Sequence, residues 1–131
     1  MDRDATIRTL RERLATEPDL MSAWLFGSVA RGTDRTSSDV DVAVLSASGS
    51  VPFERVSDLS AELGIDLGRD VQIVDLHDAP PDLVHRVLRD GVLLLDRDRA
   101  KRIGFEVRVR NLYFDLSRVW LEYRRVQAAE P

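Results

Sequence analysis

The feature that most restricts this chain is the run in which one apolar strand breaks at Gly27-Ser28 and a second strand begins ten residues later. Residues 23–26 read as the end of a buried strand, and Gly27 allows a sharp turn there. If a short helix begins at Ser28, its unpaired N–H groups and positive dipole end are suited to phosphate. Gly32 is then expected to end that helical turn. The run predicts strand, turn, short helix and strand, with an anion-binding corner where the first strand ends.

Two acidic residues, Asp39 and Asp41, open the second strand, which is predicted over residues 39–45. Residues i and i+2 share one face of a strand, so the two carboxylates point the same way while the valines next to them face the core. Neighbouring carboxylates repel unless a cation lies between them, and such hard oxygen ligands suit Mg²⁺. Arg31 adds a fork of donors that matches a phosphate. We therefore expect a metal and a phosphate-bearing ligand to bind together here.

This motif resembles the GSx10DxD motif of the minimal nucleotidyltransferases of the polymerase-beta superfamily. The resemblance covers nearly the whole chain and is closest to the antitoxins encoded beside HEPN-domain RNase toxins, the type VII pairs. It implies an α/β (α+β) fold, in which a polymerase-beta-like palm has a small mixed sheet, helices mainly on one side and a long C-terminal helix. The other segments that carry it are residues 71–81 and 87–94, Arg102, Phe105-Glu106 and residues 113–116.

The resemblance also implies an activity and a partner. A Mg²⁺-dependent protein adenylyltransferase would move AMP from ATP to a tyrosine of its cognate HEPN RNase toxin and neutralise it, within a hetero-oligomer of the two proteins. A direct role on nucleic acid is not expected. The residues expected to bind the nucleotide are Gly27, Ser28, Arg31 and Ser38, and those expected to bind the metal are Asp39 and Asp41.

One position departs from the family pattern. The family's third carboxylate sits on the third strand, predicted here over residues 70–76, and the matching residue is Gln72. A glutamine binds metal through its carbonyl oxygen but has no charge to draw a proton from an attacking hydroxyl. Asp70 is two residues earlier on the same face and is the alternative third catalytic residue, whereas Asp75 has the opposite parity and is expected to face away.

This departure keeps other functions open. A catalytically weakened antitoxin would neutralise its toxin by direct binding. A small-molecule nucleotidyltransferase, such as one acting on an aminoglycoside, is a second alternative, although the chain lacks the second substrate-binding domain that most of those enzymes use. A template-independent polymerase acting on RNA ends is a third, and the acidic body of the chain weighs against it.

Composition describes one ordinary globular domain. The chain has 131 residues, 44% hydrophobic and 32% charged, with no cysteine. We expect a single nucleotidyltransferase domain over residues 1–131, with a catalytic core at 1–96 and a helical segment at 97–127. Residues 1–96 carry 10 basic and 18 acidic side chains, whereas residues 97–125 carry 9 and 4. The sequence has neither a signal peptide nor an apolar run of membrane-spanning length, so we expect a cytoplasmic protein away from membranes.

The remaining segments alternate between helical and strand periodicity. The last helix, continuous or broken, has an apolar row from Phe105 to Tyr123, and its part beyond residue 110 is a candidate surface for docking a partner. Residues 64–68 are predicted as a turn. The other predictions are helices over residues 4–17, 52–63, 81–89 and 98–126 and strands over 20–26 and 92–95, in addition to those given above.

Overall fold

A computed structural model describes residues 1–33 and 38–129 of the chain. Its four strands form one mixed sheet in the order β3-β2-β1-β4, in which β1 pairs antiparallel with β2 and β4, and β2 pairs parallel with β3. The elements follow one another as α1 (Arg3–Leu14), β1 (Leu20–Phe26), α2 (Gly27–Arg31), β2 (Val40–Ser46), α3 (Phe53–Leu67), β3 (Val71–Asp75), α4 (Pro81–Asp90), β4 (Val92–Asp96) and α5 (Arg99–Ala129).

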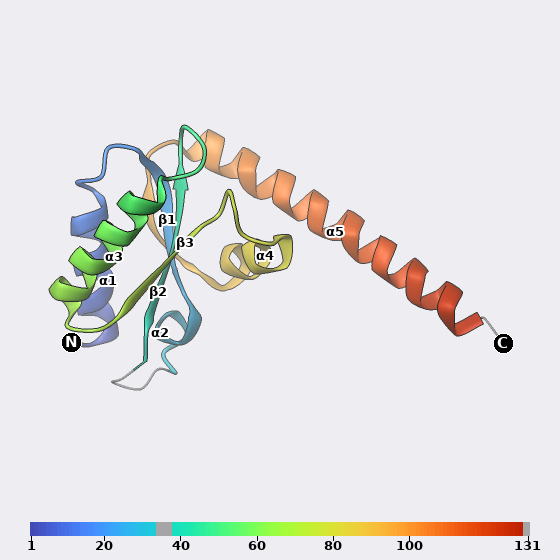
Figure 1. The fold of residues 1–131 in the computed structure, drawn as a ribbon, viewed down its shortest axis with the longest axis horizontal. Helices are drawn as coiled ribbons and strands as arrows, with labels where there is room; N and C mark the ends of the chain where they lie inside the picture. Colours follow the sequence, from blue (N-terminus) through green and yellow to red (C-terminus); the bar gives the residue numbers. More distant parts are fainter. Residues whose placement is uncertain (34–37, 130–131) are drawn as a thin grey trace.

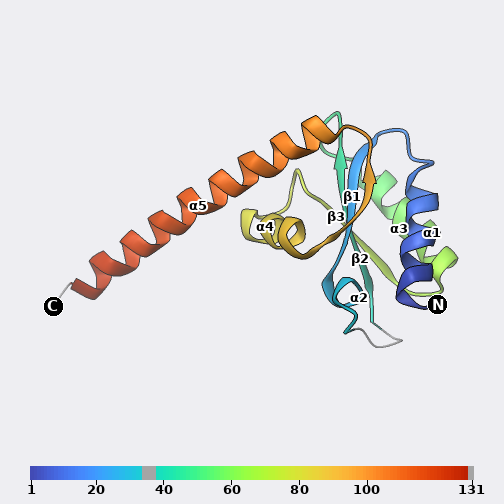
Figure 2. The same cartoon turned by 180° about the vertical axis from the view of Figure 1, so that it is seen from behind.

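Helices cover both faces of this sheet (Figure 1). Strand residues alternate between the faces, so Val42 and its even-numbered neighbours in β2 pack with α1 and α3, whereas Ala43 and Leu45 pack with α4. The same division is seen from behind (Figure 2). The expectation of helices mainly on one side was therefore wrong, because α4 and the first turns of α5 bury the second face.

Helix α3 is longer than predicted. It runs through Gly64 to Leu67 and ends at Gly68, which has φ 65°. Leu59, Leu63 and Leu67 follow one another at the four-residue spacing of one helix face, and all three are buried. Burial of the last leucine outweighs the low helix propensity of Gly64, so the turn predicted over residues 64–68 is replaced by one more helical turn.

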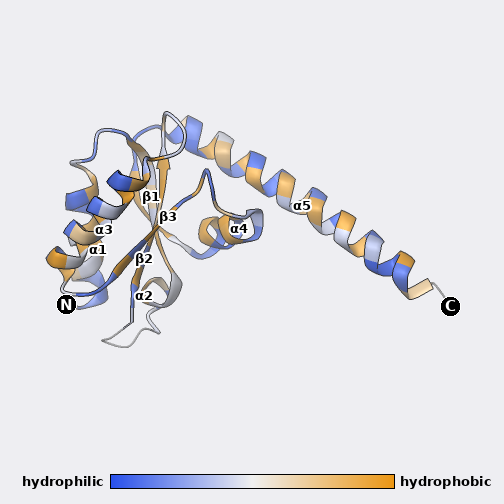
Figure 3. Ribbon diagram, viewed as in Figure 1, coloured by the Kyte–Doolittle hydropathy of each residue, from blue (hydrophilic) through white to orange (hydrophobic). Residues whose placement is uncertain are grey.

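Helix α5 is a continuous arm of 31 residues that projects away from the rest of the molecule (Figures 1 and 2). Its base is fixed by Arg102, whose guanidinium lies 3.0 Å from Asp96 and 2.9 Å from Glu106. Farther along, the ring of Tyr113 stacks on His85 of α4 at 3.8 Å between centroids. Beyond these contacts, hydrophobic and hydrophilic residues alternate along an exposed helix (Figure 3). Within residues 1–33 and 38–129, no helix is long and apolar enough to cross a membrane.

Candidate active site

Gly27 lies directly against Asp41 where β1 ends. Phe26 is the register partner of Asp41 in the β1–β2 ladder, and the chain turns at Gly27 with φ 76°. A Cβ atom at Gly27 would overlap Asp41 Oδ2. Glycine is needed here for two reasons, because the backbone is left-handed and because a carboxylate occupies the space of a side chain.

Helix α2 begins at this contact. Val29 and Ala30 are buried and fix the short helix to the sheet, while Ser28 is half-buried in its first turn. Gly32 ends the helix in a left-handed conformation, as predicted, and Thr33 N donates to Ser28 O at 3.0 Å. The first N–H groups of a helix have no partner within it, so the start of α2 offers donors next to the carboxylate of Asp41.

Asp39 and Asp41 form an unequal pair. Strand β2 begins at Val40, one residue later than predicted, so Asp39 precedes it and is exposed while Asp41 is half-buried. Burial, and then the charge of Asp39, raise the pKa of Asp41 above its ordinary value, and the charge of Arg31 opposes this rise. Two carboxylates that repel each other therefore lie beside a helix start whose N–H groups attract phosphate. This donor set fits a hard divalent cation bound together with a phosphate.

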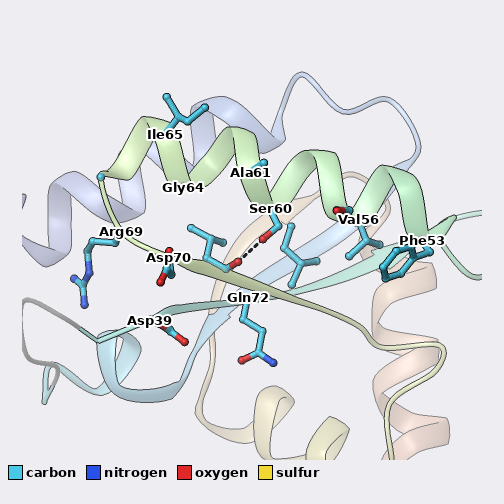
Figure 4. Close-up of a pocket in the computed structure, with 14 residues that line it drawn as sticks. Asp39, Phe53, Val56, Ser60, Ala61, Gly64, Ile65, Arg69, Asp70 and Gln72 are labelled. Carbon is cyan, nitrogen blue, oxygen red and sulfur yellow. Dashed lines mark hydrogen bonds between the residues drawn. The ribbon is translucent and has the colours of Figure 1, made fainter.

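Gln72 is the direct neighbour of Asp41 across the β2–β3 ladder. Its side chain is exposed and extends away from α3, toward the side on which Asp39 lies (Figure 4). Asp70 lies just before β3, where its carbonyl accepts from Val40 N at 2.9 Å, and its side chain is exposed. In the described part of the chain, no group of three or more His, Cys, Asp and Glu residues is placed to hold a metal ion. The third catalytic residue stays a prediction, with Gln72 beside Asp41 and Asp70 two residues before Gln72, ahead of the start of β3.

Arg69 is a residue of this corner that sequence reasoning missed. Its Nε and Nη2 atoms donate to the Ser38 carbonyl at 3.0 and 2.6 Å. This fork joins the turn after α3 to the residue immediately before Asp39, so it helps to fix where the exposed carboxylate begins. Nothing local in the sequence indicates the contact, because Ser38 and Arg69 meet only through the parallel pairing of β2 with β3.

Asp75 lies apart from this site, as its parity predicts. It pairs with Val44 on the opposite face, and its carboxylate accepts from Val51 N at 2.6 Å and from His77 N at 3.0 Å. The ring of His77 lies 3.0 Å from the Ser46 carbonyl through Nε2. These bonds hold the loop before α3 and the end of β3 in place, which is a structural role.

The fold and this corner define a class of enzyme: the chain belongs to the polymerase beta nucleotidyltransferase family, whose model ("Polymerase beta, Nucleotidyltransferase") matches residues 8–100. Within that class it is similar to the protein adenylyltransferase MntA of Shewanella oneidensis. The two sequences are 31% identical over 113 residues, which cover 86% of this chain and 78% of that protein. The predicted family is thereby confirmed.

Solved structures give the same result. A toxin–antitoxin crystal structure with AMP-PNP superimposes with a TM-score of 0.75 and 28% identity, over 98% of this chain and all of that one. A structure of the tri-AMPylated S. oneidensis HEPN toxin in complex with the MNT antitoxin matches with a TM-score of 0.69 and 26% identity, over 97% of this chain and 96% of that one. The predicted palm with a mixed sheet and a long C-terminal helix is confirmed.

Proposed function

We propose that this protein is the antitoxin of a toxin–antitoxin pair and that it transfers AMP from ATP to a tyrosine of a HEPN-domain RNase toxin. The observation that carries the proposal is the contact between Gly27 and Asp41, which puts the start of α2 against a carboxylate. Such a corner holds a triphosphate and a cation side by side. The adenylyltransferase relative and the two complexes described above support AMP as the transferred group and a HEPN protein as the acceptor.

In this proposal each residue of the corner has one task. The N–H groups at the start of α2 and the Ser28 hydroxyl hold phosphate oxygens, and Gly27 lets them approach. Arg31 balances phosphate charge, and Ser38, fixed by Arg69, borders the nucleotide. Asp39 and Asp41 are the ligands of Mg²⁺, which would stabilise the charge that develops on the phosphates.

The transfer exchanges one phosphorus–oxygen bond for another. The acceptor hydroxyl attacks the α-phosphorus in line, its oxygen–phosphorus bond forms, and the bond to the bridging oxygen breaks so that pyrophosphate leaves. Positioning and electrostatics supply most of the rate. The proton of the hydroxyl needs an acceptor, and Asp70 is the candidate base because Gln72 has no charge. A phenol ionises near pH 10, far more readily than an aliphatic alcohol. Among hydroxyl acceptors, a tyrosine is therefore the one that a site with a weak base can deprotonate most easily.

The exposed part of α5 is proposed to dock the toxin. A monomer exposes few contiguous apolar side chains of this size, and an amphipathic helix commonly lays its apolar face into a groove of its partner. Arg118, Arg124 and Arg125 are exposed on the same part of α5 and fit an acidic partner surface. The exposed apolar residues of this face are Leu112, Leu116, Val119, Trp120, Tyr123 and Val126, whereas Phe114 and Leu121 are exposed on the opposite side of the helix.

Gln72 favours a second function, in which the protein neutralises its toxin by binding alone. A site with two carboxylates and no charged third residue would transfer AMP slowly, and α5 would then carry the neutralisation. We place either activity in the cytoplasm, where ATP is available.

Co-expression with the protein encoded next to this chain separates the two functions. The partner's intact mass is measured after co-expression with wild type, with the double variant Asp39→Asn/Asp41→Asn and with Asp58→Asn, an exposed carboxylate of α3 outside the site. We expect AMP on the partner with wild type and Asp58→Asn, and none with the double variant. A partner that stays unmodified yet co-purifies and is silenced would establish neutralisation by binding.

A further inference from the structure

A groove runs along the open edge of the sheet, between β3 and the outer side of α3 (Figure 4). One wall is apolar and includes Val56 and Ala61 of α3, and the groove reaches Asp39 and Gln72 at the active-site end. Phe53 and Ile65 border the groove near its two ends, with 83% and 82% of their surface exposed, and the Ile65 side chain points to the side of α3 away from β3 (Figure 4). A groove bordered by exposed apolar residues that ends at the catalytic carboxylates indicates a binding surface that serves the active site.

The backbone of β3 offers hydrogen bonds along this groove. β3 is an edge strand, and its Asp70 carbonyl and Leu76 N–H point inward to β2, with bonds of 2.9 and 3.0 Å. The groups of a strand alternate in direction, so those of Val71, Ile73 and Asp75 point to the open edge. Ser60 Oγ already donates to the Val71 carbonyl, which is the dashed bond in Figure 4, and the groups of Ile73 lie two residues farther along the strand. An open edge of this kind is a template for another strand.

We infer that an extended segment of the acceptor protein binds here as an added strand, pairing with the edge of β3. This inference rests on the proposed transfer of AMP to a protein and specifies how the hydroxyl is presented. Side chains of the added strand would alternate between the apolar wall of α3 and the opposite face, on which Gln72 and Asp41 lie. The acceptor residue is the one that pairs beside Gln72.

The spacing between strands limits which acceptor hydroxyl can approach Asp41. Neighbouring strands lie about 4.8 Å apart, so a residue beside Gln72 is roughly 10 Å from Asp41 across the ladder. Side chains stand roughly perpendicular to a sheet, so a hydroxyl beside Gln72 approaches Asp41 only on a side chain long enough to lean across the face, such as tyrosine. Serine and threonine are too short to do so, and the geometry thus favours tyrosine by its length as well as its acidity.

The charge of the groove indicates which residues the acceptor segment carries. Asp39 and Asp70 line the groove with exposed carboxylates, and the body that carries it has 18 acidic and 10 basic side chains over residues 1–96. Such an edge attracts a segment with basic residues beside its hydroxyl. The surface of an RNase that holds the phosphates of its RNA is of this kind, and an extended segment of that surface bound here would be withdrawn from RNA.

Two groove variants and a matched control test the inference. Phe53→Asp and Ile65→Asp each replace an exposed apolar residue of the groove, and Val107→Asp does the same on α5, where the side chain is 43% exposed and outside the groove. We expect the groove variants to raise the KM for the HEPN protein roughly tenfold and to leave the affinity for AMP-PNP unchanged. The control variant should keep the wild-type KM. Wild-type rates in both groove variants would overturn the inference.

Amide hydrogen exchange of residues 71–75 is the second readout. Slower exchange on adding the HEPN protein, also with the Asp39→Asn/Asp41→Asn form, supports strand addition even if no AMP is transferred, so failure of the transfer and failure of the inference are distinguishable. Unchanged exchange in β3 would overturn the inference. Protection that depends on the concentration of this chain alone would also overturn it, because a second copy would then be the occupant.

Discussion

Gly27 and Asp41 are in contact across the end of the β1–β2 pair, with a carboxylate oxygen where a side chain would begin. We expect Gly27→Ala to lower AMP transfer by about a hundredfold, since displacing a catalytic group by an ångström costs that much. Gly49→Ala is the control, because Gly49 also has a positive φ, 106°, but has no atom near the site of its Cβ. The measurement is the rate of AMP transfer at fixed protein stability, and equal losses in both variants would show that backbone strain alone is responsible.

Ionised Asp41 should lower the free energy of unfolding at neutral pH when no metal is bound. Its pKa is raised in the fold by burial and by Asp39, so the folded state binds the proton more tightly than the unfolded chain. Stability then falls as pH rises from the ordinary aspartate range through this raised pKa. Thermal unfolding in EDTA should show Asp41→Asn more stable than wild type at pH 7, with the difference vanishing in acid. Equal melting temperatures of Asp41→Asn and wild type at both pH values would show that the ionised carboxylate does not destabilise the fold.

Gln72 offers a gain-of-function test. We expect Gln72→Glu to bind Mn²⁺ more tightly without nucleotide, because a third charge joins Asp41 on one face, and to transfer AMP roughly tenfold faster or more if the missing base limits the rate. Titration followed by Mn²⁺ electron paramagnetic resonance measures the first effect, and single-turnover kinetics the second. Tighter metal binding with an unchanged rate would assign proton removal to another group, Asp70 first.

The fork from Arg69 to the Ser38 carbonyl should act on nucleotide affinity. Arg69→Lys keeps the charge but loses the two-pronged geometry, with bonds of 3.0 and 2.6 Å in the wild type. We expect about tenfold weaker binding of AMP-PNP by calorimetry, because removing a bond to a charged group costs about 1.5–3 kcal/mol. The matched control is Arg89→Lys, an exposed arginine bonded to its neighbour Asp90, and an equal loss there would argue against a local effect.

The outer part of α5 should govern association rather than chemistry. Trp120→Asp places a charge on a side chain that is 60% exposed, so we expect the fold and AMP-PNP affinity to be unchanged while co-purification of the HEPN protein is lost. Lys101→Asp, at the exposed base of the same helix, is the control for charge. Retained co-purification with Trp120→Asp would remove α5 as the docking surface.

Much of this molecule could be predicted from local patterns. The alternation in β2 predicts that the valines on either side of Asp41 face the core, and the Gly27-Ser28 run predicts the turn and the short helix. The length of α3 could not be predicted, because the pairing of Leu67 with a core formed by distant segments decides it. The bond between Arg69 and Ser38 has the same origin, since it depends on which strands are neighbours in the sheet.

Because α5 is unbroken, the orientation of its docking face is fixed relative to the active site. Each residue of a helix advances it by about 1.5 Å and turns it by about 100°. Adding a single residue after Phe114, the last residue of α5 whose ring contacts His85, would rotate the outer apolar face by more than a quarter of a circle while the carboxylates kept their positions. The docked partner would then be rotated about the helix axis relative to the active site. Insertions in this arm should therefore be tolerated only where they add close to a whole number of turns, such as about 7, 11 or 18 residues, which restore the face.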